Sequence, residues 1–189
     1  MNNAQTSDQT LQQVLKARRI VRPLVLVGLM GVGKSTIGRR LATALERDFV
    51  DADEEIERAA NRSVAEIFEA HGEAYFRDGE RRVIARLMEE GHGVIATGGG
   101  AFVDDETRAL VLEQGLAIWL DCDLDTLVER TSRKDTRPLL KSGDPRTILR
   151  DLKERRSAAY AQAQVHVVTD EGPHEATVQR IVRELAAWQ

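Results

Sequence analysis

The sequence predicts an α/β fold in which helices cover both faces of a parallel β-sheet, giving three α/β/α layers. Three observations favour this class. Five apolar segments of strand length alternate with longer segments that have helical periodicity. A glycine-rich loop follows the first apolar segment and leads into a helical pattern. The chain has 189 residues, of which 42% are hydrophobic and 31% charged, which suits one globular domain with a sizeable core.

The individual elements follow from the hydrophobic pattern. Strands are expected at 24–27, near 49–50, and at 94–97, 116–120 and 165–168. Helices are expected at 34–46, 54–60, 63–90 in one or two pieces, 104–114, 123–132, 145–161 and 174–187. Strands that alternate with helices in this way indicate a parallel sheet of five strands, with the ligand site at their carboxyl ends.

Two segments fall outside this alternation. Residues 1–21 are expected to form a flexible extension before a single domain at 22–189. Their second half could be a short amphipathic helix that docks on the domain or, less favoured, binds a partner. Residues 133–145 are charged and interrupted by prolines and a glycine. Such a segment is compatible with a solvated loop, but beside a nucleotide site a mobile lid is at least as well supported.

Composition excludes several classes of protein. The net charge is −4, which does not suggest a general binder of nucleic acid or of membranes. Cys122 is the single cysteine, so an internal disulfide is impossible, and it is expected to be a buried apolar residue. The sequence has no run of 18 apolar residues, and its polar N-terminus lacks the apolar core of a signal peptide. We therefore expect a cytoplasmic protein.

The glycine-rich loop predicts a phosphate site. It reads Gly28-Leu29-Met30-Gly31-Val32-Gly33-Lys34-Ser35-Thr36 and satisfies the pattern G-x-x-x-x-G-K-[ST]. Its backbone amides and the start of the following helix can surround phosphate oxygens. Lys34 would reach the β- and γ-phosphates, and the Ser35 hydroxyl would bind Mg²⁺. A turn that binds nothing is the weaker interpretation, given the strand before it and the helix after it.

Three further clusters can carry chemistry. Asp51 and Asp53 end an apolar segment, where one could serve a metal and the other an acceptor hydroxyl, or one could cap the following helix. Gly98-Gly99-Gly100 follows a strand and permits close approach of a ligand to the backbone. Four arginines lie beside these signals and can pair with carboxylates or phosphates, or lie on the solvated surface: Arg77, Arg130, Arg137 and Arg156.

These motifs together resemble the shikimate kinase family over residues 22 to 187. The resemblance rests on Gly28 to Thr36, Asp51-x-Asp53, Gly72-Glu73-x-x-Phe76-Arg77-x-x-Glu80, Gly98-Gly99-Gly100, Arg137-Pro138-Leu139-Leu140 and Arg156-x-x-x-Tyr160, in the family's order and spacing. It implies a P-loop NTPase fold like that of nucleoside-monophosphate kinases, with a five-stranded parallel sheet. It also implies transfer of the γ-phosphate of ATP to the 3-hydroxyl of shikimate with Mg²⁺.

The resemblance assigns expected roles to individual residues. Lys34, Asp53 and Arg137 would be catalytic, with Asp53 holding the acceptor hydroxyl. ATP would contact Gly31, Val32, Gly33, Lys34, Ser35, Thr36, Arg130 and Arg137. Shikimate would contact Asp53, Arg77, Gly98, Gly99, Gly100 and Arg156, with Phe68 and Phe76 as apolar walls and Glu80 orienting the arginines. Ser35 would bind Mg²⁺ directly, and Asp51 would reach it through water.

Some features differ from the family pattern, and two other functions remain open. Ala158 and Ala159 stand where the family often has a proline, and the segment Thr169 to His174 lacks the basic residue often found beside adenine. A kinase for another hydroxy acid such as gluconate would keep the phosphate loop, but the arginine and glycine set weighs against it. A non-catalytic sensor tends to lose the lysine or the aspartates, and both are present here. We expect a monomer.

Overall fold

The computed structural model describes residues 13–14, 17–132, 143–170 and 172–188. Its strands are β1 (Leu24–Val27), β2 (Phe49–Asp51), β3 (Val94–Ala96), β4 (Leu116–Cys122) and β5 (Val165–Thr169). They form a single sheet in the order β2-β3-β1-β4-β5, and every neighbouring pair is parallel. The predicted fold class is confirmed, and β1, which precedes the glycine-rich loop, is the central strand.

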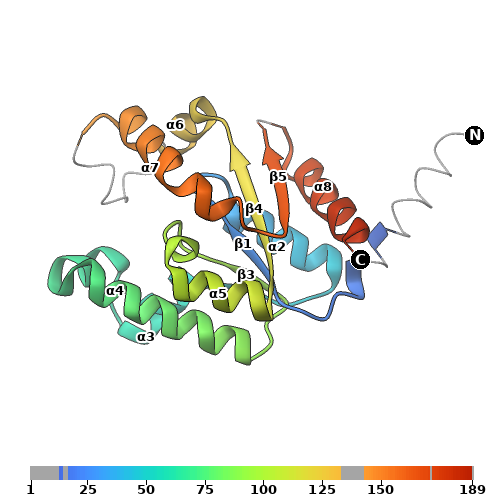
Figure 1. Cartoon of the computed structure of the whole chain (residues 1–189), viewed down its shortest axis with the longest axis horizontal. Coiled ribbons are helices and arrows are strands. Elements are labelled where there is room, and N and C mark those ends of the chain that lie inside the picture. Colours follow the sequence, from blue (N-terminus) through green and yellow to red (C-terminus); the bar gives the residue numbers. More distant parts are fainter. Residues whose placement is uncertain (1–12, 15–16, 133–142, 171, 189) are drawn as a thin grey trace, which may run out of the picture.

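Helices cover both faces of this sheet (Figure 1). They are α2 (Lys34–Leu45), α3 (Ala52–Ala60), α4 (Val64–Glu89), α5 (Asp105–Gln114), α6 (Leu124–Ser132), α7 (Pro145–Tyr160) and α8 (His174–Ala187), with a 3₁₀ turn η1 (Ala101–Val103). Helices α2 and α8 pack together on one face, whereas α4, α5 and α7 lie over the other. Connections between parallel strands are right-handed. A connecting helix therefore lies on one face of the sheet when the chain moves in one direction along it, and on the other face when the chain moves in the opposite direction.

The core lies around the central strand. All four residues of β1 are fully buried because helices cover both of its faces. This explains why the strand reads as a continuous apolar run and not as an alternating one. Cys122, at the end of β4, is buried as the sequence predicted. None of the helices in the described part of the chain has the length and apolar character of a membrane span.

Several helix boundaries have identifiable causes. Ser63 and Glu66 form a capping box at the start of α4, and Asp144 caps α7 by accepting a hydrogen bond from Thr147 N at 2.9 Å. The sequence left open whether 63–90 is one helix or two. In the structure α4 consists of two helical pieces joined at Gly72, whose φ of 77° and ψ of 177° are not helical.

The described part of the N-terminal extension packs on the domain. Residues 13–14 and 17–18 are helical, and Ala17 and Ile20 are buried in the main core. Arg18 donates a hydrogen bond to Ala44 O at 3.1 Å and pairs with Glu46, so α2 provides the docking surface. Residues 1–12 and 15–16 lie outside the described residues, as do residues 133–142 of the expected lid. The division into 1–21 and 22–189 stays a prediction.

Candidate active site

The glycine-rich loop connects the end of β1 to the start of α2. Gly28 has a φ of 135° and lies so close to β4 that a Cβ there would be 2.3 Å from Leu120 O. Gly33 has a φ of 96° and begins the 12-residue helix α2 without a capping hydrogen bond from any described side chain. The first N–H groups of α2 are therefore available for an anion, and the helix dipole favours negative charge there.

Lys34 folds back over this loop. Its Nζ donates hydrogen bonds to Gly28 O at 2.8 Å and to Leu29 O at 3.0 Å. These two carbonyls hold the ammonium group beside the loop backbone, where the sequence predicted a phosphate contact. A single positive charge at this position can neutralise phosphate oxygens without further rearrangement of the backbone.

Asp51 serves two purposes at the end of β2. Its Oδ1 accepts a hydrogen bond from Asp53 N at 3.0 Å and so caps α3, which was the structural alternative for this pair. Its Oδ2 accepts a hydrogen bond from Ser35 Oγ at 2.6 Å. Ser35 and Asp51 thus bring two hard oxygen donors together beside the phosphate loop, which is the donor chemistry that Mg²⁺ prefers.

Asp53 lies two residues further on, in the first turn of α3. Burial raises the pKa of its carboxyl to about 6, and the nearby charge of Asp51 adds to this effect while Lys34 opposes it. A carboxyl with this pKa is mostly ionised at neutral pH yet can accept a proton from a substrate. Asp53 thus has the protonation chemistry that a general base needs, close to the charge of Lys34, and its catalytic role stays a prediction.

Arg77 and Glu80 form a buried ion pair on α4. Arg77 Nη1 lies 2.6 Å from Glu80 Oε2, and Glu80 is only 2% exposed. Burial raises the pKa of Glu80 to about 6, against the effect of Arg77. Glu80 Oε1 is buried and has no hydrogen-bond partner among the described residues. The pair holds one guanidinium in a fixed orientation, and an unpartnered acceptor remains beside it.

The three glycines after β3 make room for these side chains. A Cβ at Gly98 would lie 2.6 Å from Glu80 Oε1 and 2.8 Å from Asp53 Oδ1. At Gly100 it would lie 2.4 Å from Arg77 Nη2. Sequence reasoning explained the run by close approach of a ligand, whereas the groups that approach Gly98 and Gly100 here belong to the protein itself. This packing signal could not be recognised without the fold.

Gly99 meets the fourth element of the site, helix α7. Its carbonyl oxygen accepts a hydrogen bond from Arg156 Nη1 at 2.9 Å and a second one from Tyr160 Oη. A Cβ at Gly99 would lie 3.2 Å from Met30 N in the glycine-rich loop and 3.5 Å from Arg156 Nη1. The glycine run therefore lies between the phosphate loop and the arginine of α7.

Arg130 lies at another part of this edge, near the start of α8. Its Nη2 donates a hydrogen bond to Asp170 O at 2.7 Å, and its Nη1 is buried without a hydrogen-bond partner among the described residues. The start of α8 also approaches the loop, because a Cβ at Gly33 would be 3.9 Å from His174 Cε1. This places the segment after β5 beside the start of α2.

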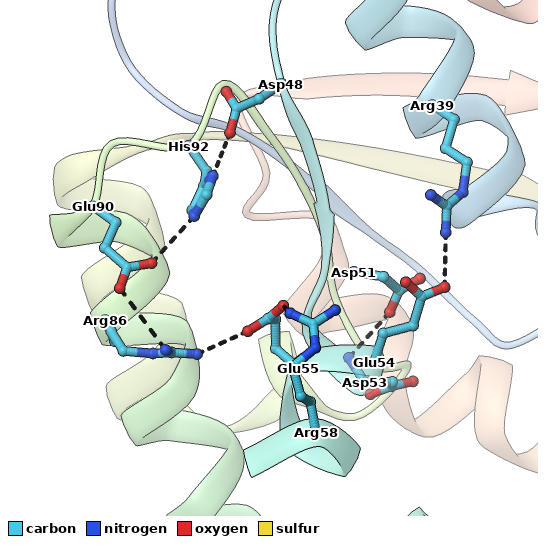
Figure 2. A network of polar contacts seen from close by, with 10 residues as sticks. All are labelled: Arg39, Asp48, Asp51, Asp53, Glu54, Glu55, Arg58, Arg86, Glu90 and His92. Carbon is cyan, nitrogen blue, oxygen red and sulfur yellow. Dashed lines mark hydrogen bonds and ion pairs between the residues drawn. The ribbon is translucent and has the colours of Figure 1, made fainter.

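The two predicted wall residues lie in a small apolar cluster between α3 and α4. Phe68 and Phe76 have ring centroids 4.6 Å apart, and Phe76 is buried with Ile56 and Ile67. Figure 2 shows that ion pairs also anchor α3, with Glu54 bonded to Arg39 of α2 and Glu55 to Arg86 of α4. Asp53 is thus carried by a helix that is fixed on two sides.

The structure thus gathers most of the predicted residues at the carboxyl edge of the sheet. Lys34, Ser35, Asp51 and Asp53 lie together, and Arg77, Glu80 and Arg156 surround the glycine run beside them. Arg137 lies outside the described residues. Sequence reasoning gave no role to Tyr160, although its motif contains it.

A phosphate loop beside a half-buried carboxylate and two arginines defines a P-loop kinase for a small anionic acceptor. Comparisons with known proteins agree. The sequence profile of the shikimate kinase family matches residues 30–186, and the chain belongs to this family. The shikimate kinase of Novosphingobium aromaticivorans is 61% identical over 175 residues, which cover 90% of this chain and 91% of the relative. The shikimate kinase of Caulobacter vibrioides is 56% identical over 87% of this chain and 82% of the relative.

Solved structures give the same result. The fold matches a shikimate kinase from Acinetobacter baumannii in complex with shikimate, with a TM-score of 0.86 and 36% identity over 91% of this chain and 97% of that one. A gluconokinase from Sinorhizobium meliloti matches with a TM-score of 0.61 and 18% identity, over 89% of this chain and 94% of that one. At that identity the second match shows the shared fold alone.

Proposed function

We propose that this protein transfers the γ-phosphate of ATP to the 3-hydroxyl of shikimate, giving shikimate 3-phosphate and ADP. The observation that carries the proposal is the position of Gly98–Gly100 between the phosphate loop and the side chains of Asp53, Arg77 and Arg156. A nucleotide on the loop would then have its terminal phosphate beside the carboxylate, and the arginines would hold an acid next to it.

The residues divide the chemistry between them. The acceptor hydroxyl gives its proton to Asp53 as its oxygen bonds to the γ-phosphorus, and the bond from that phosphorus to the β–γ bridging oxygen breaks. Lys34 and the N–H groups at the start of α2 neutralise the charge on the phosphates. Arg77, oriented by Glu80, and Arg156 pair with the shikimate carboxylate, because planar guanidinium groups suit this partner. Gly98, Gly99 and Gly100 form the backbone beneath the acid.

Ser35 and Asp51 would hold the magnesium ion that accompanies ATP. Their 2.6 Å hydrogen bond brings two oxygen donors together, and Mg²⁺ usually adds phosphate oxygens and water to one or two protein ligands. The ion would supply positive charge to the phosphates. Arg130, with its unpartnered Nη1, is proposed to contact the nucleotide.

Arg137 is proposed to complete the site from the lid at residues 133–145. An arginine that contacts the transferring phosphate typically contributes on the order of 10³-fold in rate or more. Closure of the segment would also exclude water, which would otherwise hydrolyse ATP. A cytoplasmic location, a monomeric state and the absence of nucleic-acid and membrane partners stay predictions.

An ADP-coupled assay with a panel of acceptors tests the proposed function. We expect ADP release from the purified protein to require Mg²⁺ and shikimate, with little activity toward gluconate or without an acceptor. Preference for gluconate would favour the other kinase function. Binding of shikimate and ATP without turnover would favour the sensor function.

A further inference from the structure

The carbonyl group of Gly99 accepts hydrogen bonds from two side chains of one helix. Arg156 Nη1 donates from 2.9 Å, and the Tyr160 hydroxyl donates from the next turn of α7. These donors are four positions apart on α7, so both face the same point. A carbonyl oxygen has two lone pairs and can accept both bonds.

Tyr160 is the fixed member of this pair. It is 2% exposed, and its ring lies against Trp119 of β4 with centroids 5.9 Å apart. Burial raises the pKa of its hydroxyl, so the group stays protonated and remains a donor. The nearby charge of Arg156 opposes this shift. Arg156 is half-buried and ends in a fork of N–H groups that can turn toward another acceptor.

The ligand-free arrangement creates a conflict that Tyr160 resolves. Under the proposed function, Arg156 gives N–H groups to the acceptor's carboxylate, yet Nη1 is bonded to Gly99 O here. If that nitrogen turned away and Tyr160 did not also donate to Gly99 O, the carbonyl would lose its partner in a partly buried site. An unpartnered buried carbonyl is costly, so the arginine would tend to stay on the backbone.

We propose that Tyr160 is a positioning residue that keeps the Gly99 carbonyl hydrogen-bonded and so releases Arg156 to bind the carboxylate of the acceptor. This inference rests on the proposed function, which places that carboxylate at Arg156. Gly99 also lies beside Met30 N and Gly28 O. A fixed Gly99 carbonyl therefore holds α7 in a fixed position relative to the phosphate loop. Tyr160 acts through Gly99 and Arg156 and contacts neither reactant.

Tyr160→Phe tests this proposal because it removes the hydroxyl and keeps the ring. We expect KM for shikimate to rise about tenfold, the effect of one hydrogen bond whose acceptor is left unsatisfied. We expect kcat and KM for ATP to change less than about twofold, since such a change removes binding alone. Tyr75→Phe is the matched control, because Tyr75 is the other tyrosine of the chain and is 54% exposed.

A double-mutant cycle separates this role from a structural one. In an Arg156→Ala background, Tyr160→Phe is expected to leave KM for shikimate unchanged, because no guanidinium remains to be released. When Arg156 is kept and the acceptor is the methyl ester of shikimate, which lacks the charged carboxylate, Tyr160→Phe is also expected to leave KM for the acceptor unchanged. A Tyr160→Phe effect that persists in either test overturns the proposal, as does a lower unfolding midpoint without any change in KM.

Two further outcomes distinguish failure of the inference from failure of the proposed function. A wild-type protein that does not phosphorylate shikimate would contradict the function itself. An active wild-type protein whose Arg156→Ala variant has a raised KM, and whose Tyr160→Phe variant does not, would overturn the role of Tyr160 alone. Crystals with shikimate give a readout without variants. Arg156 Nη1 is expected on the carboxylate with Tyr160 Oη still on Gly99 O, and an arginine that keeps Gly99 O contradicts the proposal.

Discussion

Gly98 lies against the buried carboxyl group of Glu80 and the half-buried one of Asp53, and the absence of a side chain there has a testable consequence. Gly98→Ala would place a methyl group 2.6 Å from Glu80 Oε1 and 2.8 Å from Asp53 Oδ1, closer than any stable contact. Both carboxyl groups would have to move. Because displacement of catalytic groups by about 1 Å can cost about 100-fold in rate, we expect kcat/KM for shikimate to fall at least about tenfold in a coupled assay.

Gly79→Ala provides the matched control for this substitution. Gly79 lies in the same helix as Glu80, and a Cβ there would meet nothing within 4 Å. Because alanine favours the helix more than glycine, this variant should unfold at a higher denaturant concentration, by about 0.5–1 kcal/mol, and keep its activity. Equal loss of activity in both variants would show that steric crowding at Gly98 is not the cause.

Asp53 provides a second test of the reaction's proposed residues. Asp53→Asn keeps the size of the side chain but removes the base that accepts the hydroxyl proton. We expect phosphoryl transfer to fall by about 10²- to 10⁴-fold, the usual contribution of a general base. Nucleotide binding, measured by titration with ADP, should persist because the phosphate loop is untouched. Near-normal turnover would remove Asp53 from the site.

A pH-dependent contact joins the loop before β2 to the loop between α4 and β3. Figure 2 shows His92 between two carboxylates, with Nδ1 on Asp48 and Nε2 3.2 Å from Glu90 Oε2. The Asp48 hydrogen bond raises the pKa of His92 above its ordinary value, burial opposes this effect, and Glu90 adds to it. The same chain of contacts continues through Arg86 to Glu55 of α3, which carries Asp53.

His92→Ala should therefore lower stability mainly under acidic conditions. A histidine whose pKa is raised in the folded state stabilises the fold fully below its unfolded pKa of about 6.5, and the contribution is lost as pH rises through the higher folded value. We expect a loss below about 1 kcal/mol at pH 6, since this site is near the surface, and less at pH 8.5. Urea unfolding at the two pH values measures it.

Asp48→Asn serves as the partner variant for this test. It should remove most of the same pH dependence, and adding His92→Ala to it should change little further. A destabilisation by His92→Ala that is as large at pH 8.5 as at pH 6 would show that the side chain contributes by packing and not by its charge.

The whole chain shows which parts of a fold a single sequence can predict. The apolar run Leu24–Val27 is buried on both faces, and the glycine pattern after it is typical of a loop between a strand and a helix. The central strand and the phosphate loop were therefore predictable. The resemblance supplied the roles of Asp53, Arg77 and Arg156, which stay predictions. The Tyr160–Gly99 bond joins residues 61 positions apart. Neither periodicity nor spacing encodes such a contact, so only the packing of α7 against η1, which follows the glycine run, reveals it.

The account requires that the acid and the nucleotide bind side by side at one edge of the sheet. Calorimetric titration of shikimate into the ADP-bound protein tests this directly, by comparing the wild type with Arg77→Ala/Arg156→Ala. The exposed pair Arg82→Ala/Arg155→Ala controls for lost charge, since both arginines lie on the surface. We predict one site in the wild type and in the control, and affinity at least about 100-fold weaker without the two site arginines. Undiminished binding by that variant would contradict the account.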